Sequence, residues 1–239
     1  MIVQPPALMD HWDDFDRANS TDLGPNWRPD FDSCQIFNQQ VQISTPAQLS
    51  ARQGAWETYV APDSHNGGRL ITDNWEVAAE IGTPAGGIAT DNATAIGCGM
   101  LDNGPAAGMC LVYAIFFQGT QNATNAMAIY TYINASIVSP GGSWGVTPAT
   151  SRAAVTNRVA AGDIIRFRRR MYSPTQSVFQ LIQNGILRVS WNDSVGIVPA
   201  GQANRRRWFL SCEGNAAGAF SGQYYSPAIA NIRAHDRPY

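Results

Sequence analysis

The sequence contains no lysine, and all 16 of its basic residues are arginines. Charged residues make up only 14% of the 239 residues, well below the usual quarter. The polar surface must therefore come from amides, hydroxyls and glycine, as it does on proteins that pack against other subunits or bind sugars. A GC-rich genome explains the arginine bias, and an assembly surface, where arginine is favoured over lysine, is a compatible second explanation.

The chain also lacks the positive charge that nucleic-acid binding requires. Its net charge is −2 and its sequence pI is about 5.9. Two arginine runs, Arg168 to Arg170 and Arg205 to Arg207, lie in or beside expected strands, where successive side chains point to opposite faces. We therefore expect solvated or interface arginines and no nucleic-acid partner.

Long apolar runs and closely spaced cysteines are missing as well. No segment approaches the 18 consecutive apolar residues of a membrane-spanning helix, so we expect no membrane insertion. The four cysteines, at positions 34, 98, 110 and 212, lack the Cys-x-x-Cys spacing of a metal or redox motif. A chain of this size can build its core without disulfides, so buried free thiols are expected.

No stretch has a convincing 3.6-residue apolar period, whereas strand patterns are frequent. Trp75, Val77, Ala79 and Ile81 alternate with polar or small residues, which is typical of a half-buried strand. Met109 to Gln118 is a continuous apolar run, which predicts a central strand buried on both faces. About a dozen such segments, separated by turn residues, predict an all-β sandwich or barrel.

The clearest local prediction is a three-stranded antiparallel meander. Alternating segments around Ile165, Phe179 and Val189 are separated by Ser173-Pro174-Thr175 and by Asn184-Gly185. Asn-Gly is the strongest short hairpin signal, because both residues tolerate positive φ.

A motif near the N-terminus brings a family resemblance. The segment from Asp14 to Trp27 contains Phe15-Asp16-Arg17-Ala18, then Leu23-Gly24, then Asn26-Trp27. It resembles the opening of minor tail proteins of tailed phages that infect actinobacteria (mycobacteriophage-like). In those proteins the opening leads into a concanavalin A-like lectin/glucanase (laminin-G-like) domain. Independently of the resemblance, Phe15 and Trp27 are expected core anchors.

Later segments are similar to the same fold. Asp163 to Phe167, Leu181, Asn184-Gly185 and Trp191 resemble its middle meander, and Ala228 to Asp236 resembles its closing strand, which returns to pair near the N-terminal one. The resemblance implies a two-sheet antiparallel jelly-roll sandwich. We expect one such domain over residues 10–239, preceded by an extended arm, residues 1–9, in which Pro5-Pro6 disfavours helix.

Two glutamates on one strand are the catalytic candidates. Laminarinase-type glucanases with this jelly roll use Glu-x-Asp-x-Glu, and here Glu76 and Glu80 flank Ala78. All three positions share a face. The central Asp is missing, and Cα atoms four residues apart on a strand are roughly 13 Å apart, whereas a retaining mechanism needs carboxyl groups about 5–5.5 Å apart. We therefore expect that the protein is not an enzyme. The alternative to a catalytic pair is that Glu76 and Glu80 are two solvated glutamates on the polar face of a strand.

Calcium is the one cofactor with candidate ligands. Asp13, Asp14 and Asp16, with Asp22 nearby, supply loop oxygens that suit calcium, although an Asp-rich turn is also ordinary turn chemistry. His11, His65 and His235 lack zinc spacing, and surface positions are expected for them.

Four aromatic residues are candidates for sugar binding or for an interface. Trp144, Tyr172, Tyr224 and Tyr225 stand in segments with loop-like composition. A loop aromatic of this kind serves either as a sugar platform or as an anchor in a protein interface.

These observations support three hypotheses. The first is a structural minor tail protein in the tail tip or fibre of a phage virion, contacting other tail proteins and further copies of itself, and contributing to attachment to host cell-wall glycan. The second is a free carbohydrate-binding module. The third is a glucanase-like enzyme that cleaves glycans.

Overall fold

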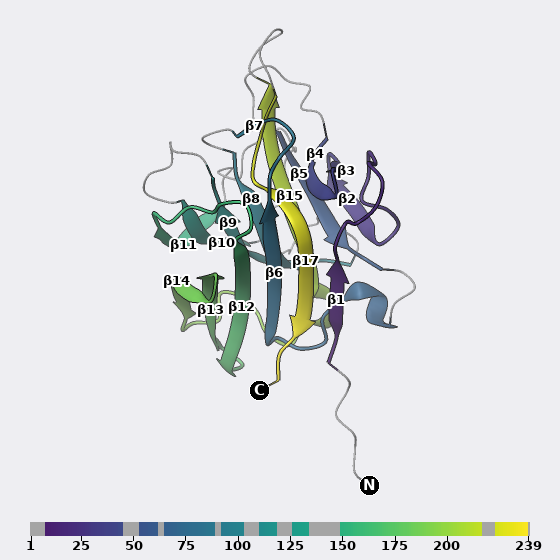
Figure 1. Ribbon diagram of the computed structural model, residues 1–239. Coiled ribbons are helices and arrows are strands. Elements are labelled where there is room, and N and C mark those ends of the chain that lie inside the picture. The colour runs from purple at the N-terminus through teal and green to yellow at the C-terminus, as the bar shows by residue number, and fades with distance from the viewer. Residues whose placement is uncertain are drawn as a thin grey trace.

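The computed structural model describes residues 8–44, 53–61, 65–88, 92–102, 110–118, 126–133, 149–216 and 223–238. In these ranges the chain forms two β-sheets and two short 3₁₀ helices, η1 (His65–Gly68) and η2 (Ala203–Arg205), as Figure 1 shows. No helix in this part of the chain is long and apolar enough to cross a membrane.

The first sheet is antiparallel and contains both terminal strands of the described chain. Its order is β14 (Ile186–Asp193), β13 (Gln176–Gln183), β12 (Ile164–Ser173), β6 (Trp75–Gly82), β17 (Ala228–Asp236), β4 (Gln40–Ile43) and β3 (Cys34–Phe37). β1 (Asp10–Asp13) also pairs with β17, so the closing strand lies beside the first one, as expected (Figure 1).

The second sheet is antiparallel apart from one short pair. Its order is β11 (Thr150–Val155), β10 (Met127–Ile133), β9 (Cys110–Phe116), β8 (Thr94–Met100), β15 (Arg207–Ala216), β16 (Gln223–Tyr225) and β7 (Gly87–Ile88), the last two being parallel. β5 (Gln53–Tyr59) pairs with β15 and with β2 (Trp27–Phe31).

The predicted meander is confirmed. β12, β13 and β14 pair in sequence, and the β13–β14 turn places Asn184 at φ 51° and Gly185 at φ 81°. These positive angles are those that the Asn-Gly pair accepts at low cost. The hairpin therefore fixes the register of the sheet edge from local sequence alone.

The core lies between the two sheets and is rich in aromatic rings. Trp208 stacks on Tyr59 at 4.5 Å and meets Trp27 edge-on at 5.1 Å, and Phe15 lies 6.0 Å from Trp27 between ring centroids. Phe15 and Trp27 are 0% and 5% exposed, so both predicted core anchors are confirmed. His11 is also buried and packs 5.4 Å from Tyr59, so the expected surface position is wrong for this histidine.

The long apolar run is a strand buried on both faces, as predicted. Every residue of β9 is buried. Its inward positions join the core between the sheets, and its outward positions belong to a second apolar cluster with Phe209 of β15. The four cysteines are buried and free, as expected from the size of the chain.

Candidate functional site

The outer face of the first sheet carries polar side chains above an apolar core. On β6, Val77 and Ala79 point into the core, so Glu76, Ala78 and Glu80 point away from the second sheet. These outward residues line a hollow of about 390 Å³. Its other lining residues are Ala79, Ile164, Arg166, Asn231, Arg233, His235, Arg237 and Pro238.

Two arginines face the Glu76 carboxylate. Arg237 is hydrogen-bonded to it, and Arg166 lies 3.9 Å away. Glu76 is only 3% exposed, so the expectation of a solvated glutamate is wrong here, because the paired charge allows the carboxylate to be buried. Glu80 accepts a hydrogen bond from the side-chain amide of Asn231. Both candidate carboxylates therefore have partners within the sheet.

The remaining ionisable groups in this hollow, Arg233 and His235, come from β17, and Arg233 pairs with Asp10 of β1. Asp10 accepts two hydrogen bonds from the guanidinium of Arg233, which lowers the pKa of that carboxyl group from its usual value. Burial lowers the pKa of the His235 imidazole, so this side chain is neutral at neutral pH. The hollow thus presents arginine as its cationic group.

Two further hollows adjoin the first. One, of about 410 Å³, shares Arg237 and Pro238 with it. The other, of about 930 Å³ and mainly apolar, shares Met171, Tyr172 and Pro238 with the second. We call these three adjoining hollows the outer groove. It is lined by parts of β6, β12 and β17, by the residues 71–74 before β6, by Ala200, Gly201 and Arg206, and by Leu8, Arg237 and Pro238.

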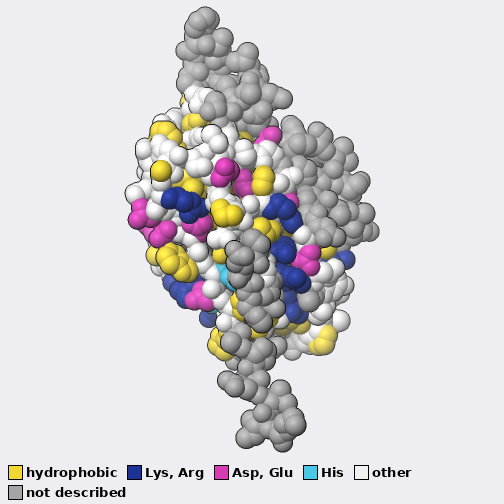
Figure 2. Space-filling model, turned by 90° about the vertical axis from the view of Figure 1, so that its right-hand side faces the viewer, with side chains coloured by type: hydrophobic (Ala, Val, Ile, Leu, Met, Phe, Trp, Pro, Cys, Tyr) yellow, Lys and Arg dark blue, Asp and Glu magenta, His cyan; other side chains and the backbone are white. Residues whose placement is uncertain are grey.

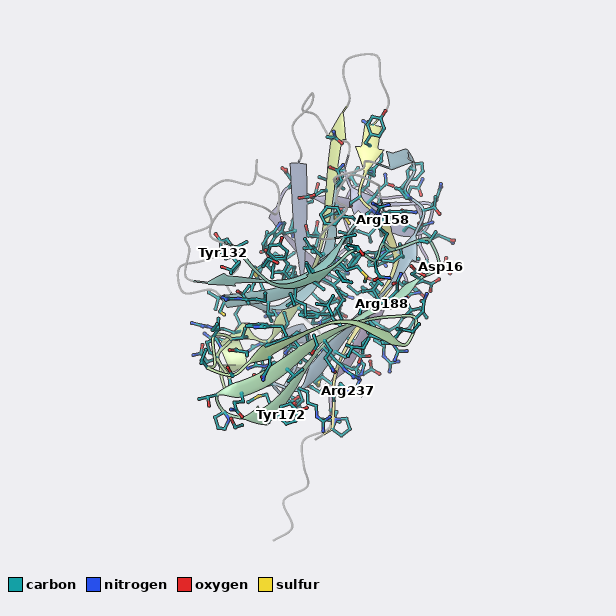
Figure 3. All side chains as sticks on the ribbon, turned by 90° about the vertical axis from the view of Figure 1, so that its left-hand side faces the viewer. Asp16, Tyr132, Arg158, Tyr172, Arg188 and Arg237 are labelled. Atoms are coloured by element: carbon teal, nitrogen blue, oxygen red, sulfur yellow. The ribbon has the colours of Figure 1, made fainter. Side chains whose placement is uncertain are left out.

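Tyr172 stands where the second and third hollows meet. It is the outward residue at the end of β12 and is 61% exposed, with the guanidinium of Arg170 5.2 Å from its ring centroid. Figure 3 shows Tyr172 and Arg237 at the same end of the sandwich, and Tyr132 at another place on it. Tyr172 is thus a predicted binding residue that has an accessible ring.

The other aromatic candidates lie elsewhere. Tyr225 belongs to β16, is 4% exposed and packs in the core, so the prediction of a loop aromatic is wrong for this residue. Tyr224 belongs to the same strand, is half-buried and pairs with Gly87 of β7. Tyr172 lies in β12, so the expected loop position is wrong for these two residues as well. Trp144 lies outside the described residues.

The aspartates considered as calcium ligands accept hydrogen bonds from nearby protein groups in and after β1. Asp13 accepts hydrogen bonds from the Arg17 guanidinium at 2.7 Å and from the Trp27 indole at 2.8 Å. Asp14 accepts the backbone N–H of Asp16, whose own carboxylate accepts from the Gln39 side chain. In the described part of the chain, no three His, Cys, Asp or Glu side chains converge as metal ligands would.

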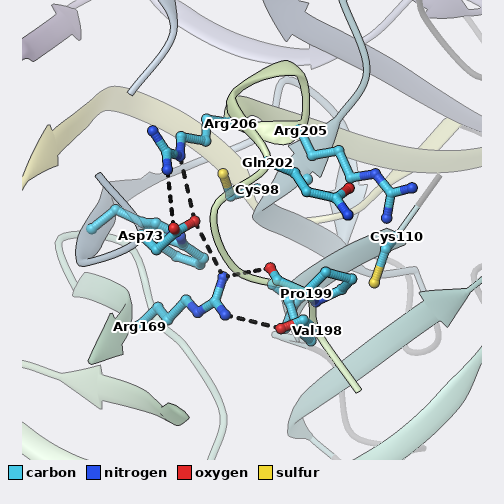
Figure 4. A pocket seen from close by; sticks show the side chains of 12 residues that line it. Asp73, Cys98, Cys110, Arg169, Val198, Pro199, Gln202, Arg205 and Arg206 are labelled. Carbon is cyan, nitrogen blue, oxygen red and sulfur yellow. Dashed lines mark hydrogen bonds and ion pairs between the residues drawn. The ribbon is translucent and has the colours of Figure 1, made fainter. Parts of the chain in front are cut away.

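A buried arginine supports the groove from below. Arg169 is 4% exposed and donates to the carbonyl oxygens of Val198 and Pro199 at 2.9 and 3.1 Å, as Figure 4 shows. Its guanidinium lies 3.6 Å from Asp73, which also pairs with Arg206 at 3.0 Å. Burial lowers its pKa, and Asp73 partly offsets that shift. This network ties β12 to the segment that follows β14, so the strand end bearing Tyr172 is held rigidly.

Sequence reasoning missed the contribution of β17 and β1 to this face. Asn231, Arg233 and His235 alternate along the closing strand, and this alternation was the signal that could have identified them. Trp12 lies opposite Arg233 in the β1–β17 register and is 64% exposed. It is a second exposed aromatic residue on the outer face of the sheet.

The sequence matches no protein-family model and no curated protein. Solved structures are similar over nearly the whole chain. The carbohydrate recognition domain of Emp46p, in its potassium-bound form, is 10% identical with a TM-score of 0.54, covering 96% of this chain and 100% of that chain. The CBM2 module of the evolved Dit of Lactobacillus casei BL23 phage J-1 is 10% identical with a TM-score of 0.52, covering 97% and 99%.

The Emp47p carbohydrate recognition domain is also similar, at 6% identity and a TM-score of 0.51, with 91% of each chain covered. At such identities the likeness concerns the fold. The predicted fold class is therefore confirmed as a two-sheet jelly-roll sandwich of the concanavalin A-like, lectin-type class.

Proposed function

We propose that this chain is a glycan-binding domain and that it binds glycan in the outer groove. The observation that carries the proposal is the groove itself, because three adjoining hollows meet at Pro238 and two of them meet at Tyr172. An exposed aromatic ring beside polar donors suits a sugar, since the ring covers a C–H face while the donors bind hydroxyl groups. The lectin-type fold supports this use of the sheet.

The wider setting of the proposal is the phage virion. In this role the chain is a structural minor tail protein of the tail tip or fibre, assembled with other tail proteins and further copies of itself, and it contributes to attachment to host cell-wall glycan. The motif from Phe15 to Trp27 and the likeness to the phage J-1 Dit module both support this setting. The low charge of the chain also suits a protein with large contacts.

Pull-down of actinobacterial wall polysaccharide by the purified protein tests glycan binding. We expect the wild-type protein to bind, and Tyr172→Ala to weaken binding about tenfold, as loss of an aromatic anchor does. Phe37→Ala is the matched control, because Phe37 is a partly exposed aromatic residue at the far edge of the same sheet. Absence of binding by the wild-type protein would overturn the proposal.

The virion setting has its own test. Mass spectrometry of purified virions is expected to detect this chain in a defined number of copies. A virion preparation without the chain would remove the tail role and leave glycan binding to the pull-down experiment.

A further inference from the structure

The outer groove carries arginines at alternating positions on β12 and β17, the two strands that flank β6, and directly after β17. Alternation along β12 places Arg166, Arg168 and Arg170 on the outer face, while Arg169 points inward. Arg233 on β17 points outward in the same way. Arg237 follows β17 directly and contacts Glu76 on the outer face. Five guanidinium groups on the outer face of the sheet therefore lie along the groove.

The register of β6 leaves a space between two of these arginines. Arg166 on β12 and Arg233 on β17 both lie opposite Ala78, one from each side. A methyl group thus forms the floor where a longer side chain would fill the gap. The side chains of Arg166 and Arg233 are 50% and 57% exposed, so both guanidinium groups are accessible above this floor.

The carboxylates of this face balance only part of the positive charge. Asp10 forms an ion pair with Arg233, and Glu76 forms ion pairs with Arg237 and, at a longer distance, with Arg166. Glu80 is the third carboxylate on this face, so five arginines on the outer face of the sheet meet three acids there, on a chain whose net charge is −2. Arg206 and Asp73, which line the third hollow, pair with each other.

Two of the arginines have no acidic partner in the described part of the chain. Arg168 donates to the Gln180 side chain at 2.7 Å, and Arg170 lies against the Tyr172 ring. The groove is therefore a locally cationic surface on an acidic chain, with positive charge available to a ligand.

This pattern selects one kind of ligand. Guanidinium groups bind carboxylate and phosphate oxygens in a bidentate geometry, and Tyr172 and Trp12 offer ring faces to sugars on the same side of the sheet. A nucleic acid fits less well, because its unbroken row of phosphates would also lie against Asp10, Glu76 and Glu80. A polymer with acidic groups spaced along it can place them between these carboxylates.

We propose that the ligand of the outer groove is an anionic glycan, whose carboxylate or phosphate groups bind Arg166 and Arg233 above Ala78 and Arg168 and Arg170 beside Tyr172. The proposal rests on the glycan-binding function assigned to the same groove. The arginines supply the recognition of charge, and the exposed aromatic rings supply the contact with the sugar rings.

Calorimetric titration with defined polymers tests this class of ligand. The probes are polygalacturonate, its fully methyl-esterified form as an uncharged polymer of the same backbone, poly(glycerol phosphate) and single-stranded DNA. We expect at least one acidic polymer to bind, the methyl ester to bind about tenfold more weakly or not at all, and NaCl raised from about 0.05 to about 0.5 M to weaken binding. The two acidic polymers distinguish carboxylate from phosphate.

Variants locate the effect in the groove. Arg166→Gln combined with Arg233→Gln is expected to weaken binding of the acidic polymer about tenfold or more, since each substitution removes a charge-assisted hydrogen bond to the ligand. Arg188→Gln is the matched control, because it removes the same charge from β14, outside the lining of the groove. Circular dichroism and thermal unfolding confirm that each variant is folded.

The experiments distinguish failure of the anionic-ligand proposal from failure of the glycan-binding proposal. Equal binding of the charged and esterified polymers, binding of neither acidic polymer, tighter binding of DNA, or an unchanged affinity in the double variant each overturns the anionic ligand. Wall polysaccharide bound without sensitivity to salt would keep the glycan-binding function and remove the anionic class alone.

Discussion

The outer faces of the two sheets differ although their inner faces are alike. The inner positions of both sheets join one apolar core. Outward positions of the second sheet, such as Leu111, Tyr113 and Phe209, are buried in an apolar cluster of their own. Outward positions of the first sheet, such as Arg166 and Tyr172, are exposed around the outer groove. The described part of the sandwich therefore has one outer face that is buried by apolar packing and one that exposes polar and charged side chains.

The arginine-bearing face is also distinct from the edge of the molecule. Figure 2 views the molecule from the right-hand side of Figure 1 and shows basic and acidic side chains next to one another among scattered hydrophobic patches. Near the N-terminal end of the described chain, Arg17 and Asp13 form such a pair of opposite charges. A surplus of cations within a hollow is what sets the outer groove apart.

The largest difference between the faces should appear when a matched leucine is truncated on each. Leu111→Ala on the second sheet removes a fully buried side chain, and we expect a loss of about 3 kcal/mol in the free energy of unfolding. Leu187→Ala on the first sheet affects a side chain that is 51% exposed, and we expect a change within about 0.5 kcal/mol. Urea unfolding measures both values, and equal losses would contradict the comparison.

Two adjacent arginines of β12 compare its two faces, because Arg168 points outward and Arg169 is buried. Arg169→Met leaves Asp73 and the carbonyl oxygens of Val198 and Pro199 without this donor, and we expect a loss of about 3 kcal/mol. Arg168→Met, one residue earlier on the outer face, is expected to change stability by about 0.5 kcal/mol or less. If both variants lose the same free energy of unfolding in urea, the contacts of Arg169 with Asp73, Val198 and Pro199 do not stabilise the fold.

Local patterns were sufficient for the parts of the fold that depend on neighbouring residues. The Asn184-Gly185 turn, the buried run around β9 and the alternation of Arg168 to Arg170 were all predictable, because backbone geometry and strand period decide them. Tyr172 was expected in a segment with loop-like composition, whereas it lies at the end of β12 with its ring exposed.

Contacts between distant segments decided the rest. Glu76 is buried because Arg237, 161 residues later, meets it across the sheet. Tyr225 is buried because β16 pairs with β15 and β7, although its Ser- and Gly-rich surroundings are typical of a loop. The groove itself forms from strands that come together only in the fold, so no single segment of the sequence carries its pattern.

The buried Glu57 should make the stability of the protein depend on pH. Glu57 lies between the sheets, where burial raises its pKa from 4.5 to about 8. The folded state therefore holds a proton that the unfolded chain releases above pH 4.5, so stability falls as pH rises from about 4.5 to about 8. Glu57→Gln mimics the protonated group and should stabilise the protein by on the order of 2 kcal/mol at alkaline pH and little at acidic pH.

Glu76→Gln is the control for that experiment. Glu76 faces the guanidinium groups of Arg237 and Arg166, so we expect this change to lower stability because it leaves these arginines without their carboxylate. Thermal unfolding across the pH range measures both variants. A protein whose stability does not fall between about pH 5 and pH 8, or a Glu57→Gln variant that retains the fall, would contradict the assignment to Glu57.

The smallest expected change in stability concerns the exposed pair beside Ala78. Asp10→Asn removes the partner of Arg233, and because both side chains are about half-exposed we expect a loss below about 1 kcal/mol. The same change leaves the Arg233 guanidinium without its carboxylate, so affinity for an acidic polymer should rise while stability stays nearly constant. Unfolding and calorimetric titration on the same preparation measure the two effects. If Arg233 binds the ligand, Asp10 competes with the ligand for its guanidinium, and removing Asp10 must raise the affinity. Unchanged or weaker binding of every acidic polymer would therefore contradict a role of Arg233 in ligand binding.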